Sequence, residues 1–427
     1  MPYKQYLHVA FASLVFATLS AGSVTCAAAA TNFKTIYAFH GPDGATPNPG
    51  LIRDSAGNFY GTTQSGGPYS CGEGCGTVFE LSPTSTGWVE TVLLDFLCGG
   101  RSGTDCPKGA TPMAGLTFDS KGNLYGTTNA GGAYSHGTVF ELSPSSDGGW
   151  VKTELYSFCA LANCADGEGI FSGLIFDQQG NLYGATFGGG QGYGVVFELS
   201  PSAEGLWNES VLYAFIGGAD GANPWGGLVA DSAGNLYGTT FLGGAEDGTS
   251  GVAYELSNVS GVWDETVIHT FDASEKDGIN PTAGMIFGPD GRLYGTTDYG
   301  GKVSRGVGIG FGTVFQLTPT SDGWTETVLL DFNGNSEGGQ PLTGLAIDSS
   351  GNLYGTTSAG GFGVGVAFEL QPESGGDWHE VLLHDFENGY DGGRPNALFP
   401  DPEGNLYGTA ATGGAAGHGV VFEINEN

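Results

Sequence analysis

Basic side chains are scarce in this 427-residue chain. Only 12 lysines and arginines stand against 45 aspartates and glutamates, which gives a formal net charge of −33. A surface of that sign repels the phosphates of nucleic acids and of anionic membranes, so neither is expected as a partner. It suits cations, neutral glycans or basic proteins, and it favours solubility outside the cell.

Long apolar segments are missing after residue 30. Within residues 1–30, Lys4 precedes an apolar run from Leu7 to Leu19, and small residues follow up to Ala30. This order is typical of a secretory signal, so we predict cleavage near Ala30. No later segment is long and apolar enough to span a membrane. We therefore expect a secreted protein that resides in the periplasm, on the cell surface or outside the cell.

Helical periodicity and catalytic motifs are also missing. No stretch combines sustained helical periodicity with caps, whereas 80 glycines and abundant aromatic residues indicate an all-β domain rather than disorder. There is no Gly-x-Ser-x-Gly elbow, no His-Glu-x-x-His and no phosphate-binding loop. These absences weaken an enzymatic function without excluding it, because propeller active sites are assembled from distant loops.

One repeat occurs in seven copies along the chain. The first string is Gly122-Asn-Leu-Tyr-Gly-Thr-Thr128 or a near copy of it. A second string, similar to Gly137-Thr-Val-Phe-Glu-Leu142, follows it in every repeat, and a third string, similar to Trp88–Phe96, follows in six repeats. Segments such as Asp54–Gly57 predict a type I turn before the first string. Four antiparallel strands per repeat are typical of a propeller blade. The tyrosines that anchor the copies are Tyr60, Tyr125, Tyr183, Tyr237, Tyr294, Tyr354 and Tyr407.

The two ends of the chain indicate a closed ring. Residues 32–39 match the fourth strand of a repeat but precede the first one, and residues 420–425 form a third strand without a fourth. The N-terminal strand is therefore predicted to complete the last blade, which removes an open sheet edge. We predict an all-β, seven-bladed β-propeller over residues 31–427, and we expect it to be a monomer.

The repeat resembles that of a known family. The unit Gly-Asn-Leu-Tyr-Gly-Thr-Thr, Gly-Gly and Gly-Thr-Val-Phe-Glu-Leu is similar to the tandem repeat of the GloVer-type "choice-of-anchor" secreted bacterial proteins, over essentially the whole chain after the signal. The resemblance carries no assigned activity and no catalytic motif. The portion Asp-x-x-Gly-Asn-Leu-Tyr also resembles NHL-type propeller repeats, which implies the fold and not a function.

Residues that recur in every repeat are expected to be structural. The rings of Tyr60, Phe79 and their equivalents are predicted to pack between blades, and tryptophans like Trp88 to cover the outer rim, where stacked sugars are an alternative. Glu80 recurs in six repeats, with Gln316 in the seventh. One carboxylate per blade lies too far from the next for paired acid–base chemistry, so we expect a repeated hydrogen-bonding role.

Six cysteines follow the signal segment, and an even number in an exported chain favours disulfides. Short spacings favour pairing between sequence neighbours, although other connectivities stay open. Zinc binding is the alternative, and neither the spacing nor nearby histidines support it. The predicted pairs are Cys71–Cys75, Cys98–Cys106 and Cys159–Cys164.

Acidic residues recur in the loops that precede the first strand of a repeat. These loops carry the chain from an outermost strand to the innermost strand of the next blade, so we expect the acids to ring one mouth of the central channel. Such a ring could bind calcium, although no single loop has the ligand density of a dedicated site. The alternative is Asp-Gly turn chemistry copied by duplication, and no other cofactor is indicated. The residues are Asp43, Asp166, Asp220, Asp277 and Asp391.

Aromatic residues in the loops after the Gly-Gly pairs are expected on the same face. Rings beside carboxylates suit glycans, because the C–H faces of sugars stack on rings while their hydroxyls bond to polar groups. The alternative is that these rings only pack the loops onto the blades. The candidate binding residues are Tyr134, Tyr193 and Tyr299, together with Trp225 from an adjacent loop that joins one blade to the next. The loops after the Gly-Gly pairs also carry Phe187, Phe241 and Phe362.

Two functions remain open for such a propeller. The first is a secreted binding or scaffolding protein that presents its loop-rich face to a glycan or to another component of the cell envelope. The alternative is an extracellular hydrolase or lyase that acts on a polysaccharide or a lactone through acids at the channel mouth. Nearly equivalent repeats favour the first, since an enzyme breaks its symmetry with unique polar residues at the channel.

Overall fold

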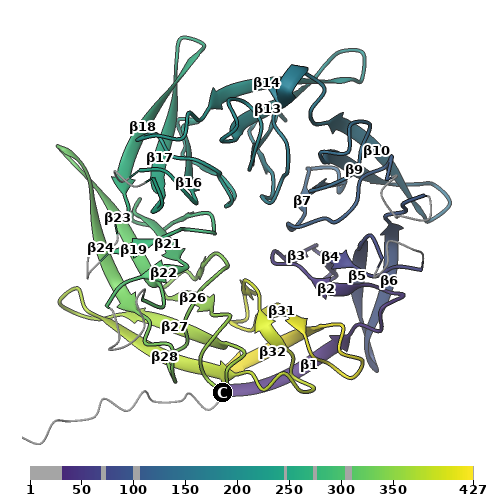
Figure 1. Ribbon diagram of the computed structural model, residues 1–427. Coiled ribbons are helices and arrows are strands. Elements are labelled where there is room, and N and C mark those ends of the chain that lie inside the picture. Colours follow the sequence, from purple (N-terminus) through teal and green to yellow (C-terminus); the bar gives the residue numbers. More distant parts are fainter. Residues whose placement is uncertain are drawn as a thin grey trace, which may run out of the picture.

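Seven antiparallel sheets surround a central axis in the computed structural model (Figure 1). The structure describes residues 31–68, 74–99, 106–244, 248–272, 277–302 and 310–426. The predicted seven-bladed β-propeller is confirmed. The predicted signal segment, residues 1–30, lies outside the described residues and stays a prediction. Among the described residues, no helix is long and apolar enough to cross a membrane.

Each blade has four strands, which we name from the axis outward. In blades 1 to 7 the innermost strands are β3 (Ile52–Arg53), β7 (Thr117–Phe118), β11 (Ile175–Phe176), β15 (Val229–Ala230), β20 (Ile286–Phe287), β25 (Ala346–Ile347) and β30 (Phe399–Pro400). The second strands are β4 (Phe59–Ser65), β8 (Leu124–Thr128), β12 (Leu182–Thr186), β16 (Leu236–Thr240), β21 (Leu293–Thr297), β26 (Leu353–Thr356) and β31 (Leu406–Thr412).

The outer half of each blade is a longer hairpin. The third strands are β5 (Thr77–Thr84), β9 (Thr138–Pro144), β13 (Val195–Pro201), β17 (Val252–Val259), β23 (Thr313–Thr320), β27 (Val366–Pro372) and β32 (Val420–Glu426). The outermost strands are β6 (Gly87–Asp95), β10 (Trp150–Ser157), β14 (Trp207–Ala214), β18 (Val262–Thr270), β24 (Gly323–Asp331), β28 (Trp378–Asp385) and β1 (Thr31–Ala38).

Four short strands and one helical turn lie outside this pattern in the described part of the chain. The strands are β2 (Ala45–Pro47), β19 (Gly278–Ile279), β22 (Tyr299–Gly300) and β29 (Gly393–Pro395), and the turn is the 3₁₀ element η1 (Ala162–Cys164). The innermost strands are only two residues long in each blade. The repeat led us to expect the first of them over residues 50–54, but Gly50 has a φ of 90°, outside the extended region, and Asp54 already begins the turn.

The turn between the first two strands is held by one aspartate. In blade 1 the Oδ1 atom of Asp54 accepts the N–H groups of Ala56 and Asn58, both at 2.9 Å. Its Oδ2 atom accepts the Tyr60 hydroxyl at 3.1 Å, and Gly57 completes the turn at a φ of 90°. The predicted type I turn chemistry is confirmed. The same contacts recur at Asp119, Asp177, Asp231 and Asp348.

The ring closes where β1 pairs antiparallel with β32, from Thr31↔Glu426 to Ala38↔Val420. The first strand of the described chain thus becomes the outermost strand of blade 7. Figure 1 shows it beside the last strand, the purple end of the colour scale against the yellow one. The predicted closure is confirmed, and it leaves no unpaired third strand in blade 7.

Aromatic rings join each blade to the next. The ring on each third strand meets the ring that follows the outermost strand of the preceding blade, with centroids 4.9 to 5.4 Å apart. The predicted packing between blades is confirmed, since edge-to-face rings at this distance stabilise a core. The pairs are Phe39–Phe79, Phe96–Phe140, Phe158–Phe197, Phe215–Tyr254, Phe271–Phe315, Phe332–Phe368 and Phe386–Phe422.

The recurring tyrosine, tryptophan and glutamate also have structural contacts. The Tyr60 ring lies against Trp150 of the next blade with centroids 6.3 Å apart, so the tryptophans pack across blade boundaries as well as covering the rim. Glu80 accepts the hydroxyl of Ser82 at 2.8 Å, and Gln316 donates to Thr318 at 2.9 Å. The expected hydrogen-bonding role of this position is confirmed.

Candidate functional site

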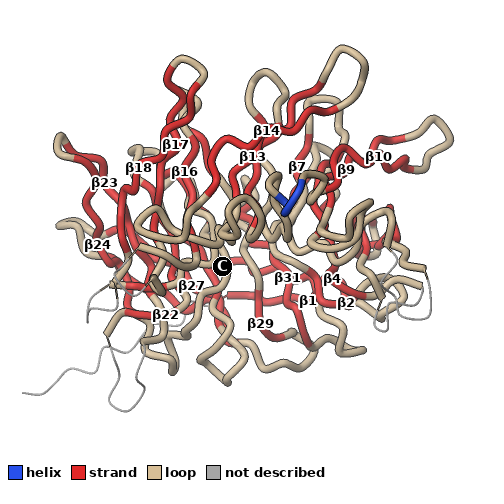
Figure 2. The backbone as a smooth tube through the Cα atoms, turned by 45° about the horizontal axis from the view of Figure 1, so that its top comes forward, coloured by secondary structure: helices blue, strands red, loops and turns tan. Residues whose placement is uncertain are grey.

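The two sets of loops named by the sequence lie together on one face. A crossing loop, the segment from an outermost strand to the next innermost strand, pairs with the end of a second strand. β2 pairs with β4, β29 with β31 and β19 with β22, and bridges such as Ala222↔Leu242 take their place elsewhere. Figure 2 shows β2, β22 and β29 on the side away from the β17–β18 hairpin turn. The sequence did not predict these pairs, because alanine and glycine give little strand signal.

A cavity of about 320 Å³ lies on the axis where the crossing loops enter the innermost strands. We call it the channel mouth. Each of the seven blades contributes to its wall, mainly with glycine and small or apolar residues. No titratable side chain is among the described residues that line it. Any ligand held there must therefore be bound by apolar surface, hydroxyls and backbone groups.

One position at the channel mouth differs between blades. It follows the crossing-loop proline, or Ile170 in blade 3. In blades 1 and 7 this residue is an asparagine. Asn48 and Asn396 each donate a side-chain hydrogen bond to a backbone carbonyl of the next blade, at 2.7 Å. In contrast, four blades place an apolar side chain on the cavity wall, and these residues are Met113, Phe171, Trp225 and Leu342. The symmetry of the repeats is therefore broken here by apolar groups.

Four rings from blades 3 and 4 gather at this position. Trp225 stacks on Phe171 with centroids 4.6 Å apart and planes at 24°. It meets Phe187 edge-on at 5.4 Å and Phe241 at 5.6 Å. All four rings are partly exposed, and we call them the aromatic cluster. The sequence singled out Trp225 but missed Phe171, which aligning the crossing loops on their shared Gly-Leu step would have found.

The three tyrosines predicted to bind with Trp225 are placed apart from it. Tyr134 and Tyr193 are 50 % and 42 % exposed, and Tyr193 lies close against Gly217 of the following crossing loop. Tyr299 belongs to β22 and is partly buried. Among the described residues no ring contact joins these tyrosines to the aromatic cluster. Their binding role stays a prediction.

The five aspartates of the crossing loops lie against outermost strands, not around the channel mouth as expected. Asp43 accepts the hydroxyl of Tyr37 on β1 at 2.6 Å, and Asp220 accepts that of Tyr213 on β14 at 3.1 Å. Asp220 also accepts the N–H of Ile216 at 2.8 Å. Because each carboxylate caps the turn that leaves its outermost strand, it sits at the start of the crossing loop. The remaining contacts are Asp166 with Tyr156, Asp277 with His269 and Asp391 with His384.

This placement leaves calcium binding by these aspartates as a prediction. It supports the turn-chemistry alternative, since hydrogen bonds occupy both carboxylate oxygens of four of these aspartates, and Asp277 alone keeps one oxygen without a partner. Blade 2 points the same way, because Lys108 replaces the aspartate. The backbone carbonyl of Lys108 accepts a hydrogen bond from the ammonium group of Lys152. Burial lowers the pKa of Lys152 to about 8. A position that accepts lysine in one repeat is not reserved for a cation.

A second set of carboxyl groups, which the sequence reasoning did not select, faces these aspartates. Each comes from the outermost strand of the next blade, two residues after its tryptophan. Burial and, to a lesser extent, the charges of the neighbouring Asp43, Asp166 and Asp220 together raise the pKa of Glu90, Glu209 and Glu265 to about 7. The pKa of Glu380 reaches about 8 by burial and by the charge of Glu337. The recurrent Trp-x-Glu spacing was the available signal.

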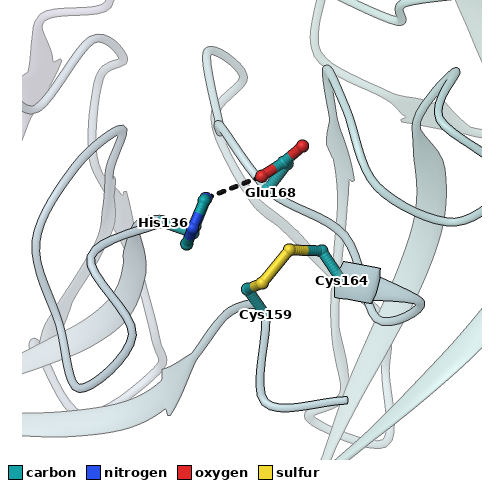
Figure 3. A group of neighbouring side chains, drawn as sticks. All are labelled: His136, Cys159, Cys164 and Glu168. Carbon is teal, nitrogen blue, oxygen red and sulfur yellow. Dashed lines mark ion pairs between the residues drawn. A yellow bond between two sulfur atoms is a disulfide. The ribbon is translucent and has the colours of Figure 1, made fainter. Parts of the chain in front are cut away.

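Two of the three predicted disulfides are present, Cys98–Cys106 and Cys159–Cys164. Cys71 lies outside the described residues, so its pairing with Cys75 stays a prediction. Figure 3 shows His136 and Glu168 beside the second disulfide, and His136 Nδ1 lies 2.6 Å from Glu168 Oε2. The fold thus supplies a histidine that the sequence did not place near these cysteines. Because the two sulfurs are bonded to each other, they are not zinc-binding thiolates.

Solved structures share this fold at low sequence identity. Puromycin hydrolase matches 87 % of this chain with 50 % of its own, at 13 % identity and a TM-score of 0.55. A gluconolactonase from Xanthomonas campestris matches 75 % of this chain with 87 % of its own, at 13 % identity and a TM-score of 0.39. A family AA12 carbohydrate-active enzyme from Trichoderma reesei matches 96 % with 100 %, at 10 % identity and a TM-score of 0.42. The likeness to puromycin hydrolase shows the fold alone.

No curated protein sequence matches the chain. The Gloeobacter/Verrucomicrobia repeat, in contrast, matches residues 17–167, 151–309 and 303–427. These matches run through all seven blades, and they agree with the resemblance drawn from the repeated strings. The chain belongs to the Gloeobacter/Verrucomicrobia repeat family.

Proposed function

We propose that the protein is a secreted carbohydrate-binding propeller that holds a neutral sugar on the aromatic cluster at the channel mouth. The observation that carries this proposal is the gathering of Phe171, Phe187, Trp225 and Phe241 beside the axial cavity. Partly exposed rings of this kind stack on the C–H faces of sugars. The cavity volume of about 320 Å³ is at the lower end for small-ligand sites, which suits one or two sugar units.

The overall charge supports a neutral rather than an anionic ligand. With a net charge of −33, the protein repels polysaccharides that carry carboxylates or sulfates. The channel mouth itself offers no basic side chain to offset that repulsion among the described residues that line it. A neutral component of the cell envelope or of extracellular polysaccharide is therefore the partner we propose.

The chemistry of the channel mouth supports binding over catalysis. A hydrolase or lyase needs a general acid or base within hydrogen-bond reach of the scissile bond. The described residues that line the cavity supply glycine, alanine, leucine, hydroxyl and aromatic groups, and none of them titrates near neutral pH. The crossing-loop acids that the enzymatic alternative relied on lie at the outermost strands instead.

A glycan array tests the proposal with three variants. We expect the purified protein to bind neutral glycans selectively, and Trp225→Ala and Phe171→Ala to abolish most of that signal because each removes a stacking face. Tyr390→Ala is the matched control, since this ring is 81 % exposed and lies outside the aromatic cluster. Its binding should equal that of the wild type.

Two outcomes would contradict the proposal. One is an array without any selective neutral-glycan signal. The other is a signal that survives both Trp225→Ala and Phe171→Ala while circular dichroism shows all proteins folded. A turnover product from the bound glycan would instead support the hydrolase or lyase alternative.

A further inference from the structure

Three different metal-ligand side chains meet between blades 4 and 5. His269 lies near the end of β18, Asp277 in the crossing loop that follows it, and Glu326 on β24. One donor atom from each lies within 4.8 Å of the other two. His269 Nε2 is 3.3 Å from Asp277 Oδ2. Ligand atoms on a tetrahedral zinc ion stand about 3.3 Å apart, so this pair already has the required spacing.

The two carboxylates present buried oxygens without a donor. Asp277 is only 8 % exposed, and its Oδ1 atom has no hydrogen-bond partner. Glu326 Oε1 is likewise buried and unpartnered, a feature it shares with the equivalent Glu90, Glu209 and Glu265, so the unpartnered oxygen of Asp277 is the one that distinguishes this boundary. Unsatisfied buried carboxylate oxygens are costly unless a proton or a cation joins them.

Surrounding groups hold the ligands in place. The backbone N–H of Asp272 donates to Asp277 Oδ2 at 3.0 Å. The His269 ring packs edge-on against Phe271, with centroids 4.7 Å apart. Metal sites depend on such outer contacts, because they orient the ligands before the ion arrives.

The other repeats show that this combination is specific to one blade boundary. Where blades 3 and 4 meet, Tyr213 takes the histidine position and donates to Asp220 at 3.1 Å. Where blades 6 and 7 meet, His384 and Asp391 are present, but Phe33 takes the glutamate position and stacks on His384 at 3.9 Å. Among the described residues, only the boundary of blades 4 and 5 brings donor atoms of a histidine, an aspartate and a glutamate within 4.8 Å of one another.

From this geometry we propose that His269, Asp277 and Glu326 bind one divalent transition-metal ion of the zinc class, which clamps blade 4 to blade 5. The mixed nitrogen and oxygen donors select this class over calcium, which takes six to eight oxygen ligands. Three protein ligands leave one position for water. The site is separate from the channel mouth and is independent of the proposed carbohydrate function.

A zinc titration of the chelator-treated protein tests the site. We expect the wild type to bind Zn²⁺ in competition with a fluorescent zinc chelator and to unfold at a higher temperature when zinc is present. His269→Tyr installs the residue that other blades carry at this position, so the fold should be kept while zinc affinity falls at least tenfold. Tyr213→His should create a second zinc equivalent, because Asp220 and Glu265 already stand beside it.

Controls separate this site from other histidines. His384→Tyr alters a histidine–aspartate pair that lacks the glutamate, so the tight zinc equivalent should remain. Glu326→Gln should weaken zinc binding even if His269→Tyr proves poorly folded by circular dichroism. The proposal is overturned if the wild type binds no zinc at micromolar concentration, if His269→Tyr and Glu326→Gln leave the affinity unchanged, or if the site prefers Ca²⁺ to Zn²⁺.

Discussion

Glu209 illustrates how a single carboxyl group couples stability to pH. Burial and Asp166 raise its pKa from 4.5 to about 7 in the folded protein. The folded state therefore keeps a proton that the unfolded state has lost between these two values. The stability that this proton contributes is complete below about pH 4.5 and is lost as the pH rises through about 7. Glu90 and Glu265 have the same direction of shift, so the effect recurs around the ring.

Replacing Glu209 by Gln should remove part of this pH dependence. Glutamine resembles the protonated acid, so we expect the variant to gain about 1–2 kcal/mol at pH 8 and little at pH 5, after allowance for solvent screening. Thermal unfolding at both pH values measures the difference. Glu204→Gln, at an exposed turn, is the control and should leave the pH dependence unchanged. Equal pH dependence in wild type and Glu209→Gln would refute this origin.

Gly226 shows a residue-scale requirement of the channel wall. A Cβ atom there would lie 2.3 Å from the carbonyl carbon of Ala283 and from the amide nitrogen of Gly284, both in the backbone of the next crossing loop. Gly226→Ala should therefore destabilise the protein by at least about 2 kcal/mol. The adjacent Gly227→Ala is the matched control, because nothing lies within 4 Å of its Cβ position. Denaturant unfolding measures the free energy of unfolding of both variants. Equal losses of stability in the two variants would contradict this account.

At the scale of elements, β1 is the strand on which ring closure depends. Its pairing with β32 covers an edge that otherwise exposes a row of backbone groups. Deleting residues 31–38 should yield a protein that self-associates, visible as dimers or larger species in size-exclusion chromatography with light scattering. A synthetic peptide of residues 31–39 should restore the monomer. A deletion variant that stays monomeric and equally stable would show that closure contributes little.

The elements that sequence predicts best are those with repeated apolar alternation. The second and third strands were predicted because Tyr60, Phe79 and their equivalents recur at a fixed place. The innermost strands were also predicted, but too long, because Gly50 and Asp54 at their ends belong to turns. The pairings of the crossing loops were not predicted, since glycine and alanine carry no pattern there. The position of Asp43 was predicted at the wrong end of its loop. The sequence shows which loop holds this aspartate. Whether the aspartate lies near the outermost strand or near the axis depends on the turn that its carboxylate caps.

The candidate site was predictable only in part for a related reason. Trp225 stood out as a large ring in a loop, but its partner Phe171 is unremarkable until the crossing loops are superposed. The meeting of Glu209 with Asp166 requires knowledge of which strand faces the next blade. Likewise His136 approaches Cys159 only through the fold, as Figure 3 shows. Contacts across blade boundaries are therefore what the repeat alone does not reveal.

At the scale of the whole molecule, seven similar blades make a closed ring whose symmetry is broken at its axis. Structural positions repeat, whereas the channel mouth carries apolar side chains in four blades and inward-turned amides in two. The acidic surface repels anionic polymers. Under the proposed function, a neutral sugar at the axis would contact the aromatic cluster of blades 3 and 4.

The most direct test of this account is the dissociation constant of the wild type and of Trp225→Ala for the strongest neutral glycan on the array, measured by calorimetry. We predict saturable binding by the wild type and at least a tenfold loss in the variant, since a central ring carries about 1–2 kcal/mol or more of such binding. Equal dissociation constants for two folded proteins would show that the sugar does not bind at the channel mouth.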